Sequence, residues 1–262
     1  MKILVTVSEV AEADDDFEID GLSIDDRYKT FDLNEWDDYA IEEAVQLSEE
    51  HDDVEVVSVT VGPERAEEVI RQGLAKGVDR AVRVWDDSLE EETLLDPGTK
   101  AKLIAGVVEQ EDPDFVFTGV QTGDIAFGAS GVSLAAELDY EWAAVVNELD
   151  LDLDAGVANV HRELEGGLEE LTEVELPAVF TIQTGINEPR YASLRGIRQA
   201  QSKPLEVETP EGIGVEIDGS TLDLTSLTVP ETESDTTLFE GSAEETAEQL
   251  AEFLVEEKGV KA

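Results

Sequence analysis

Two kinds of segment alternate along the first half of the chain, and this alternation is the strongest constraint on its fold. Short runs rich in Val, Ile and Leu, typical of buried strands, occupy residues 2–7, 54–61, 80–85 and 114–119. Segments with helical periodicity follow them, at residues 35–51, 63–77, 97–111 and 132–138. Strands linked by crossover helices lie parallel in one sheet, with helices on both of its faces. The predicted fold class is therefore α/β, with a Rossmann-like, mostly parallel sheet.

The chain changes character after Glu141. Strand-like segments separated by turn signals follow one another at residues 141–154, 157–164, 168–176 and 178–184. Such a series predicts an antiparallel extension of the sheet. Residues 8–33 are acidic and irregular, and Gly21 marks the turn of a predicted loop or hairpin.

Beyond residue 204 the chain is extended and acidic up to a last predicted helix at residues 242–257. The capping pattern Ser242-x-x-Glu245 marks the start of this helix. We therefore expect a nucleotide-binding α/β domain at residues 1–204 and an extended acidic arm with a helix at 205–262. An arm of this kind reaches onto a partner subunit or packs along the sheet.

The charge of the chain is strongly one-sided, with 65 Asp and Glu against 17 Lys and Arg and a formal net charge of −48. Such a charge repels nucleic acids and anionic membranes. On a folded surface it is typical of proteins that work in very high salt, where repulsion is screened within about 3 Å at 1 M. We therefore expect a halophilic prokaryotic source. The N-terminus indicates a strand rather than a signal peptide, and no apolar run approaches the roughly 20 residues of a membrane helix, which favours the cytoplasm.

A glycine-rich loop at residues 119–131 is the main candidate for binding. It follows a strand and opens a helix, where open parallel sheets bind phosphates on backbone N–H groups. It matches neither a Walker A loop nor a GxGxxG fingerprint, and an ordinary βα turn explains its glycines equally well.

The residues give little support for a disulfide, a metal site or a catalytic histidine. Cysteine is absent, which excludes disulfides and thiolate chemistry, and His51 and His161 are too few for a zinc site. The acidic run at 150–156 lacks the Gly and Glu of a calcium loop. No serine or acid pairs with either histidine by spacing, so binding or electron transfer is favoured over catalysis.

A long pattern then appears between Val160 and Ala200. It reads V-x-R-E-x-x-G-G-x-E from residue 160, L-P-A-V-x-T from 176, and N-E-P-R-Y-x-S-L-x-x-I-x-x-A from 187. These motifs resemble the signature region of the β subunits of electron transfer flavoproteins, which include the nitrogen-fixation-associated Fix homologues. The resemblance extends upstream to the first strand, the first helix and the second βα unit.

The resemblance implies a heterodimer with an α subunit that holds most of the redox FAD. This chain would hold AMP, or a second FAD in electron-bifurcating members. The implied nucleotide-site residues are Thr6, Asn34, Val61, Gly119, Gln121, Gly123, Asp124, Gly128, Ala129 and Ser130. Arg162 and Glu163 would lie toward the flavin domain of the partner subunit.

The resemblance also implies a recognition loop at residues 185–204, in which Leu194 anchors into partner dehydrogenases. The implied docking residues are Arg190, Tyr191, Leu194, Arg195, Ile197 and Arg198, with the arginines as candidate steering charges. Two departures from the family pattern stand out. Ile125, Gly128 and Ala129 replace a second acid and polar residues in the nucleotide loop, and the usual Lys-rich run after the recognition loop is thinned to "AQSKP".

The implied function is that of an electron carrier with no catalysis of its own. It would take electrons from flavin dehydrogenases, such as the acyl-CoA dehydrogenases of fatty acid β-oxidation, toward a membrane quinone oxidoreductase. Two alternatives stay open: an electron-bifurcating subunit with a second FAD and NADH as donor, and a stand-alone adenine-nucleotide-binding sensor. The recognition segment argues against the sensor, which has no use for a docking loop.

Overall fold

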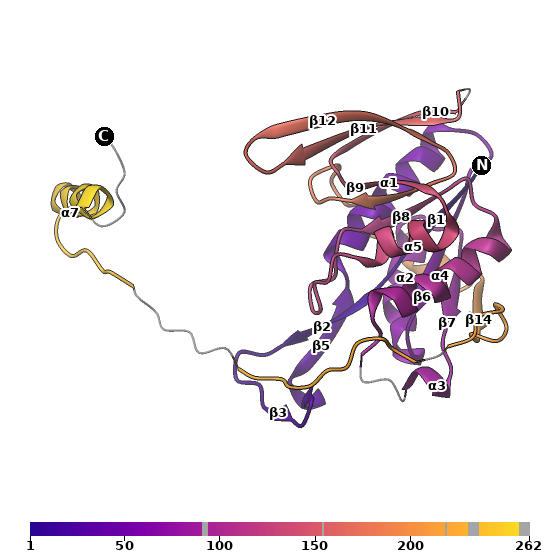
Figure 1. Cartoon of the computed structure of the whole chain (residues 1–262), viewed down its shortest axis with the longest axis horizontal. Coiled ribbons are helices and arrows are strands. Elements are labelled where there is room, and N and C mark those ends of the chain that lie inside the picture. Colours follow the sequence, from indigo (N-terminus) through magenta and orange to yellow (C-terminus); the bar gives the residue numbers. More distant parts are fainter. Residues whose placement is uncertain (91–93, 154, 218, 230–235, 257–262) are drawn as a thin grey trace. The chain divides into compact units, whose positions relative to one another are not determined.

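The computed structural model describes residues 1–90, 94–153, 155–217, 219–229 and 236–256. The chain forms two compact units, Met1–Leu227 and Thr228–Ala262. The larger unit is built on a seven-stranded sheet with the strand order β14-β7-β6-β1-β8-β13-β9 (Figure 1). Every neighbouring pair of strands in this sheet is parallel. The predicted α/β class is confirmed.

Most elements of this sheet and its covering helices lie close to their predicted positions, whereas β14, α3 and α6 were not predicted as a strand or helices. The strands are β1 (Lys2–Thr6), β6 (Glu55–Val61), β7 (Arg80–Val84), β8 (Phe115–Gly119), β9 (Glu141–Val146), β13 (Ala178–Ile182) and β14 (Leu205–Glu208). The helices are α1 (Glu35–Glu50), α2 (Glu67–Lys76) after the short turn η2 (Glu64–Ala66), α3 (Asp87–Glu90), α4 (Pro97–Glu111) and α5 (Ser130–Leu138). A further short helix, α6 (Leu194–Ala200), precedes β14.

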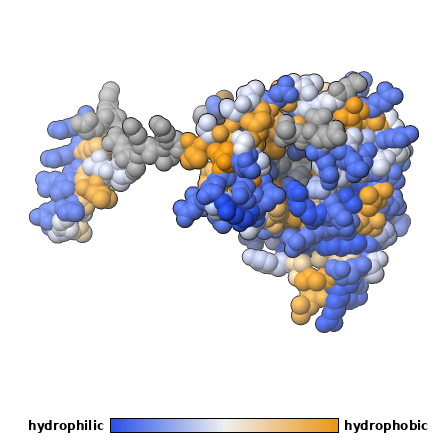
Figure 2. Space-filling model, turned by 90° about the horizontal axis from the view of Figure 1, so that it is seen from below, coloured by the Kyte–Doolittle hydropathy of each residue, from blue (hydrophilic) through white to orange (hydrophobic). Residues whose placement is uncertain are grey.

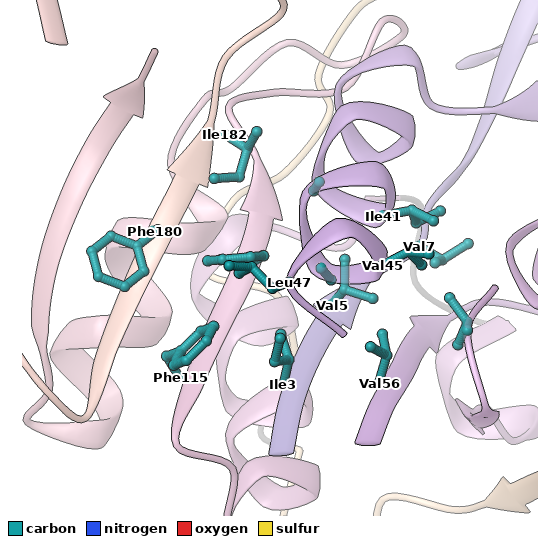
Figure 3. Packing of buried hydrophobic residues seen from close by; sticks show 14 of the residues in the cluster. Ile3, Val5, Val7, Ile41, Val45, Leu47, Val56, Phe115, Phe180 and Ile182 are labelled. Atoms are coloured by element: carbon teal, nitrogen blue, oxygen red, sulfur yellow. The ribbon is translucent and has the colours of Figure 1, made fainter. Parts of the chain in front are cut away.

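The side chains of β1 divide between two hydrophobic cores, one on each face of the sheet. Ile3 and Val5 pack on one face with Ile41 and Val45 of α1 (Figure 3). Leu4 packs on the opposite face, in the cluster that α4 and α5 cover. Successive residues of a strand point to opposite faces, so a strand covered on both sides needs apolar residues at every position. Burial of each such side chain stabilises the fold by about 1.5–3 kcal/mol.

Only part of the predicted antiparallel extension is antiparallel. A separate three-stranded antiparallel sheet is formed by β10 (Glu148–Asp152), β11 (Val157–Leu164) and β12 (Leu168–Glu175), and it packs against β9 (Figure 1). The strands β9 and β13 are instead parallel members of the central sheet. All of β13 is buried, and an uninterrupted buried run of this kind is typical of a parallel strand.

The predicted hairpin at residues 8–33 is confirmed. Its outer strands, β2 (Glu9–Ala13) and β5 (Lys29–Leu33), pair antiparallel. The shorter strands β3 (Ile19–Asp20) and β4 (Ser23–Ile24) meet around Gly21, and the turn η1 (Asp26–Tyr28) leads into β5. Gly21 has a φ of 63°, a conformation that glycine adopts without a steric penalty.

The chain beyond residue 204 does not leave the larger unit at once. The strand β14 pairs in parallel with the edge strand β7. Ile213 is then buried in the cluster on the α4 face, and Thr221 donates a 2.8 Å hydrogen bond from Oγ1 to the carboxylate of Asp96. These contacts lie within the compact unit that runs to Leu227.

The smaller unit contains the helix α7 (Ala243–Glu256). Its capping pattern forms as predicted, since the Ser242 backbone N–H donates to Glu245 at 2.8 Å and the Glu245 N–H donates to the Ser242 hydroxyl at 3.4 Å. Phe253 packs edge-on against Phe239, with ring centroids 5.8 Å apart. No residue of α7 is buried, so its apolar stripe with Leu250 and Leu254 stays partly exposed. The predicted end of the helix at residue 257 lies outside the described residues.

The face in Figure 2 is mainly hydrophilic, with apolar residues gathered in several separate patches. Among the described residues, no helix has both the length and the apolar character needed to cross a membrane.

Candidate functional site

A pocket opens at the carboxyl ends of β1, β6 and β8. The strand order reverses here, because β6 and β8 lie on opposite sides of β1, and open parallel sheets bind ligands at such a switch point. The pocket is lined by the segment Thr6–Glu9, by Val59 and Val61 of β6, by residues of the loop that follows β8, and by the first turns of α4.

The structure brings most of the predicted nucleotide-site residues to this pocket. Those that line it are Thr6, Val61, Gly119, Gln121, Asp124, Gly128, Ala129 and Ser130. Asn34 does not line it. This residue occupies the N-cap position of α1, but its Nδ2 donates a 2.9 Å hydrogen bond to the carbonyl of Gln121 instead of capping the helix. Gly123 lies in the same loop, where an added Cβ would meet no atom within 4 Å.

Asp37, which the sequence analysis did not single out, is the buried acid of the pocket. Its Oδ1 accepts hydrogen bonds from the Thr6 hydroxyl at 3.1 Å and the Gly119 N–H at 2.9 Å. Its Oδ2 accepts the N–H of Ser8 at 2.8 Å. Burial raises the pKa of Asp37, and these hydrogen bonds only partly oppose that effect. The one carboxylate thus joins α1 to the ends of β1 and β8.

A signal for Asp37 was available in the sequence. It stands three and four positions before Ala40 and Ile41, so it continues the inward face of α1, and an acid on such a face must find buried donors. Gly119 is tied to the same contact, because a Cβ there would come within 2.7 Å of the Asp37 carboxylate.

The N-terminus of α5 forms another wall of the pocket. Ala129 occupies its N-cap position and makes no side-chain hydrogen bond to the first turn. Gly131 lets the helix approach β8 and β13 closely, since a Cβ there would lie 2.5 Å from the Thr118 hydroxyl and 2.6 Å from Thr181. A helix start without a side-chain cap leaves N–H groups for an anion, which fits the phosphate of a nucleotide.

The predicted flavin-facing pair lies on β11, away from this pocket. Nε of Arg162 pairs with Glu170 on the neighbouring strand at 2.6 Å, and its Nη1 donates to the carbonyl of Ala144 at 3.2 Å. The backbone N–H of Glu163 donates to Asn147 at 3.0 Å, and the Glu163 side chain is exposed. Arg162 is therefore held across the sheet, while Glu163 is open to a partner.

The predicted docking segment is fixed to the body of the protein by two of its cations. Arg190 binds Glu42 and Glu49 of α1. The ammonium of Lys203 donates to the carbonyl oxygens of Leu74 and Val78 at the end of α2, at 3.0 and 2.5 Å. Arg190 therefore differs from the expectation of a steering charge, because its guanidinium is engaged within the chain.

The remaining predicted docking residues lie on the surface around α6. Ser193 caps this helix by accepting the Gly196 N–H at 3.0 Å. Tyr191 is 99% exposed and Leu194 is 76% exposed, and Ile197 lies one turn further. Arg195 and Arg198 are exposed on the same helix, and neither forms an ion pair with any residue that the structure describes. The segment thus presents apolar side chains and, among the described residues, two cations without an ion pair.

Comparison with known proteins agrees with this arrangement. Residues 21–211 match the family model described as the electron transfer flavoprotein domain. The chain is 44% identical to the electron transfer flavoprotein subunit beta of Methylophilus methylotrophus, over 99% of this chain and 100% of that protein.

More distant relatives carry the same description. The subunit beta of Bradyrhizobium diazoefficiens is 34% identical over 83% of this chain and 85% of its own length. That of Homo sapiens is 37% identical over 71% of each chain. This chain therefore belongs to the electron transfer flavoprotein family, as a beta subunit.

Proposed function

We propose that this chain pairs with an electron transfer flavoprotein alpha subunit and that the heterodimer carries electrons from flavin dehydrogenases, such as acyl-CoA dehydrogenases, toward a membrane quinone reductase. The FAD, held mainly by the alpha subunit, supplies the one-electron chemistry when bound. The chain itself binds the nucleotide, helps to orient the cofactor and docks on the partner dehydrogenase. A cytoplasmic place in a halophilic prokaryote is part of the same proposal, supported by the net charge of −48.

The observation that carries this proposal is the construction of the docking segment. An exposed leucine stands at the start of α6, beside an exposed tyrosine and two arginines that form no ion pair with the described residues. Arg190 and Lys203 fix the two ends of the segment to α1 and α2. An apolar anchor on a rigid mount loses little conformational freedom when it binds, which favours transient association with several partners.

The pocket supports a bound adenine nucleotide. Its glycine cradle, the uncapped start of α5 and its place at the switch point of the sheet fit a phosphate ester. We assign AMP to it, with Thr6, Val61 and the loop Gly119–Ser130 as its walls. Asn34 and Asp37 hold those walls in place through Gln121 and Gly119.

The smaller unit supports the pairing itself. Helix α7 exposes an apolar stripe, and we propose that this stripe packs on the alpha subunit. Glu163 and the exposed face of the β10–β12 sheet would lie toward the flavin domain of the same partner.

One preparation tests the proposal. The chain is produced together with its alpha subunit, and flavin and AMP are counted after denaturation. One FAD and one AMP per heterodimer are expected. Two FAD would instead indicate the electron-bifurcating alternative, and a colourless stable monomer that binds nucleotide would overturn both.

The docking role is tested in the same heterodimer with Leu194→Ala. We expect an unchanged flavin spectrum and slower reduction by a dehydrogenase. Leu22→Ala, an exposed leucine of the distant hairpin, serves as the control and should leave the rate unchanged. Equal rates for Leu194→Ala and the wild type would refute the anchor.

A further inference from the structure

Lys100 is the cation of the nucleotide pocket. It lies in the first turns of α4 and its side chain lines the pocket next to Pro97. The side chain is half-buried, and burial lowers the pKa of its ammonium, an effect that the charges of Asp124 and Asp37 partly oppose. A buried ammonium is costly unless it is paired, so the position of this lysine needs an explanation.

Within the described part of the chain, the Lys100 ammonium has no partner. None of the ion pairs within 4.0 Å includes it, and none of the hydrogen bonds does. Other lysines behave differently. Lys2 and Lys76 pair with carboxylates, and Lys203 binds backbone carbonyls. A chain with 65 acidic residues offers many partners, so an unpaired cation inside a pocket is unusual.

The two carboxylates whose charges oppose the lowering of the Lys100 pKa are already engaged elsewhere. Asp37 accepts hydrogen bonds from Thr6, Ser8 and Gly119. Asp124 accepts the backbone N–H groups of Ala11 and Ile125, at 3.3 and 2.7 Å. Both lie near enough to affect the pKa of Lys100, and neither lies within 4.0 Å of its ammonium. The Lys100 ammonium is therefore left without an ion pair to either carboxylate, and it can accept an anionic group of a ligand.

The loop that follows β8 favours the same conclusion. The loop side of the pocket carries Ile125, Phe127, Gly128 and Ala129, which offer no cationic side chain. The uncapped start of α5 adds N–H groups on this wall, but these groups carry only partial charge. Lys100 is the one full positive charge among the residues that line the pocket.

We propose that Lys100 binds the phosphate of the adenine nucleotide in this pocket and selects phosphorylated ligands over the nucleoside. This inference rests on the proposed nucleotide site and adds to it a residue outside the glycine-rich loop. An ammonium paired with a phosphate in a partly buried site makes a charge-assisted hydrogen bond, which is stronger than a neutral one.

The test uses the heterodimer with its nucleotide removed. Calorimetric titration with AMP, FAD and adenosine is compared for the wild type, Lys100→Met, Lys100→Arg and Lys102→Met. Lys102 is exposed on the same helix and is the matched control. We expect Lys100→Met to weaken AMP binding about 10- to 100-fold and to leave adenosine binding unchanged. Lys100→Arg should retain most of the affinity, and Lys102→Met all of it.

A second readout separates binding from a structural role. Without nucleotide, Lys100→Met should unfold at the same temperature as the wild type or a higher one, because it removes an unpaired, half-buried charge. With saturating AMP the order should reverse. Undiminished AMP affinity in Lys100→Met, or a lower unfolding temperature without nucleotide, would overturn the inference alone. A wild type that binds none of the three ligands would overturn the proposed nucleotide site itself.

Comparison of AMP with FAD identifies the phosphate. If the loss in Lys100→Met is equal for the two ligands, Lys100 binds the phosphate they share next to the ribose. A loss confined to AMP would place the lysine against the terminal dianion of a monophosphate. Both results support the inference.

Discussion

The guanidinium of Arg190 donates two hydrogen bonds to the carboxylate of Glu42, from Nε to Oε2 at 2.8 Å and from Nη2 to Oε1 at 3.0 Å. The same guanidinium binds Glu49 two turns further along α1, at 2.7 and 3.0 Å. Burial raises the pKa of Glu42, but hydrogen bonds from Arg190 and Gln46 outweigh it and leave that pKa below its usual value. Two-point contacts of this kind fix orientation as well as distance.

We predict that Arg190→Ala destabilises the protein and loosens the docking segment. The substitution leaves the largely buried Glu42 carboxylate without its partner, which costs about 1–3 kcal/mol of unfolding free energy. Urea unfolding measures this cost. Arg195→Ala, which removes an exposed cation on α6, should stay within about 0.5 kcal/mol of the wild type.

The same two variants distinguish an arginine that holds the docking segment in place from one that attracts a partner by its charge. Arg195→Ala should slow reduction by a dehydrogenase at low salt only, because added salt screens a steering charge. Arg190→Ala should slow it at every salt concentration. Equal stability of the two variants would contradict the mounting role of Arg190.

A second prediction concerns Asp37. Asp37→Asn keeps the shape of the side chain but replaces one acceptor oxygen with an NH2 group that faces N–H donors. We expect a loss of about 2–3 kcal/mol in unfolding free energy, since Ser8 or Gly119 loses its acceptor. Nucleotide affinity should fall as well, because both residues line the pocket.

Glu35→Gln is the control for this change. Glu35 is an exposed acid in the same turn of α1, so its loss should affect neither stability nor affinity. A stable Asp37→Asn protein with normal nucleotide binding would show that the contacts of Asp37 are dispensable.

The cations of the docking segment show how far the sequence could lead. Their clustering is visible in the sequence, and so is the motif on which the proposed docking role rests. The sequence does not show which of these cations are held by contacts within the chain. Arg190 and Glu42 are 148 positions apart, and Lys203 binds a carbonyl beyond α2 that is 125 positions away. Contacts of this range are set by how α1 and α2 pack on the sheet, which no local pattern encodes.

The strands divide in the same way. The strands β1, β6, β7 and β8 and the helices that follow them could be predicted from periodicity, because each is a local unit with a buried face. The parallel pairing of β9, β13 and β14 depends on neighbours that are distant in the sequence. At the pocket beside β1 and β8, the glycines of the loop were found by their position after a strand. Lys100 and Asp37 lie on helices that enter the site only in three dimensions.

A third prediction concerns Asp96, which caps α4 and also holds the chain beyond β14. Its carboxylate accepts the Thr99 N–H at 2.8 Å, together with the hydroxyls of Ser220 and Thr221 at 2.9 and 2.8 Å. Burial raises the pKa of Asp96, but these hydrogen bonds more than offset it and place the pKa below its usual range. Asp96→Ala should therefore cost about 1–2 kcal/mol at neutral pH, as lost helix caps do.

This cost should depend on pH with a definite sign. A carboxyl whose pKa is lowered by folding stabilises the native state above its unfolded pKa of about 3.9 and loses that contribution as the pH falls. The difference in unfolding free energy between wild type and Asp96→Ala should therefore shrink as the pH is lowered below about 4. Glu109→Gln, an exposed change on the same helix, should show no such trend. A difference that is constant with pH would contradict the role of the ionised carboxylate.

The last prediction concerns salt, and it follows from 65 acidic residues facing 17 basic ones. Salt weakens the ion pairs that hold the docking segment and also the repulsion among the excess carboxylates. The repulsive pairs are far more numerous, and the screening length falls from about 10 Å at 0.1 M to about 3 Å at 1 M. Stability should therefore rise with potassium chloride.

Glu173→Gln tests this charge repulsion at a single site. Glu173 is exposed on β12 and no ion pair engages it among the described residues. Its neutralisation should raise the unfolding temperature at low salt, by an amount that corresponds to less than about 0.5 kcal/mol, and should have no effect at high salt. A neutral osmolyte at equal osmolality controls for solvent exclusion and should leave the difference between the two proteins intact. If the difference persists unchanged in salt, local packing and not charge repulsion is the cause, because only the electrostatic contribution is screened.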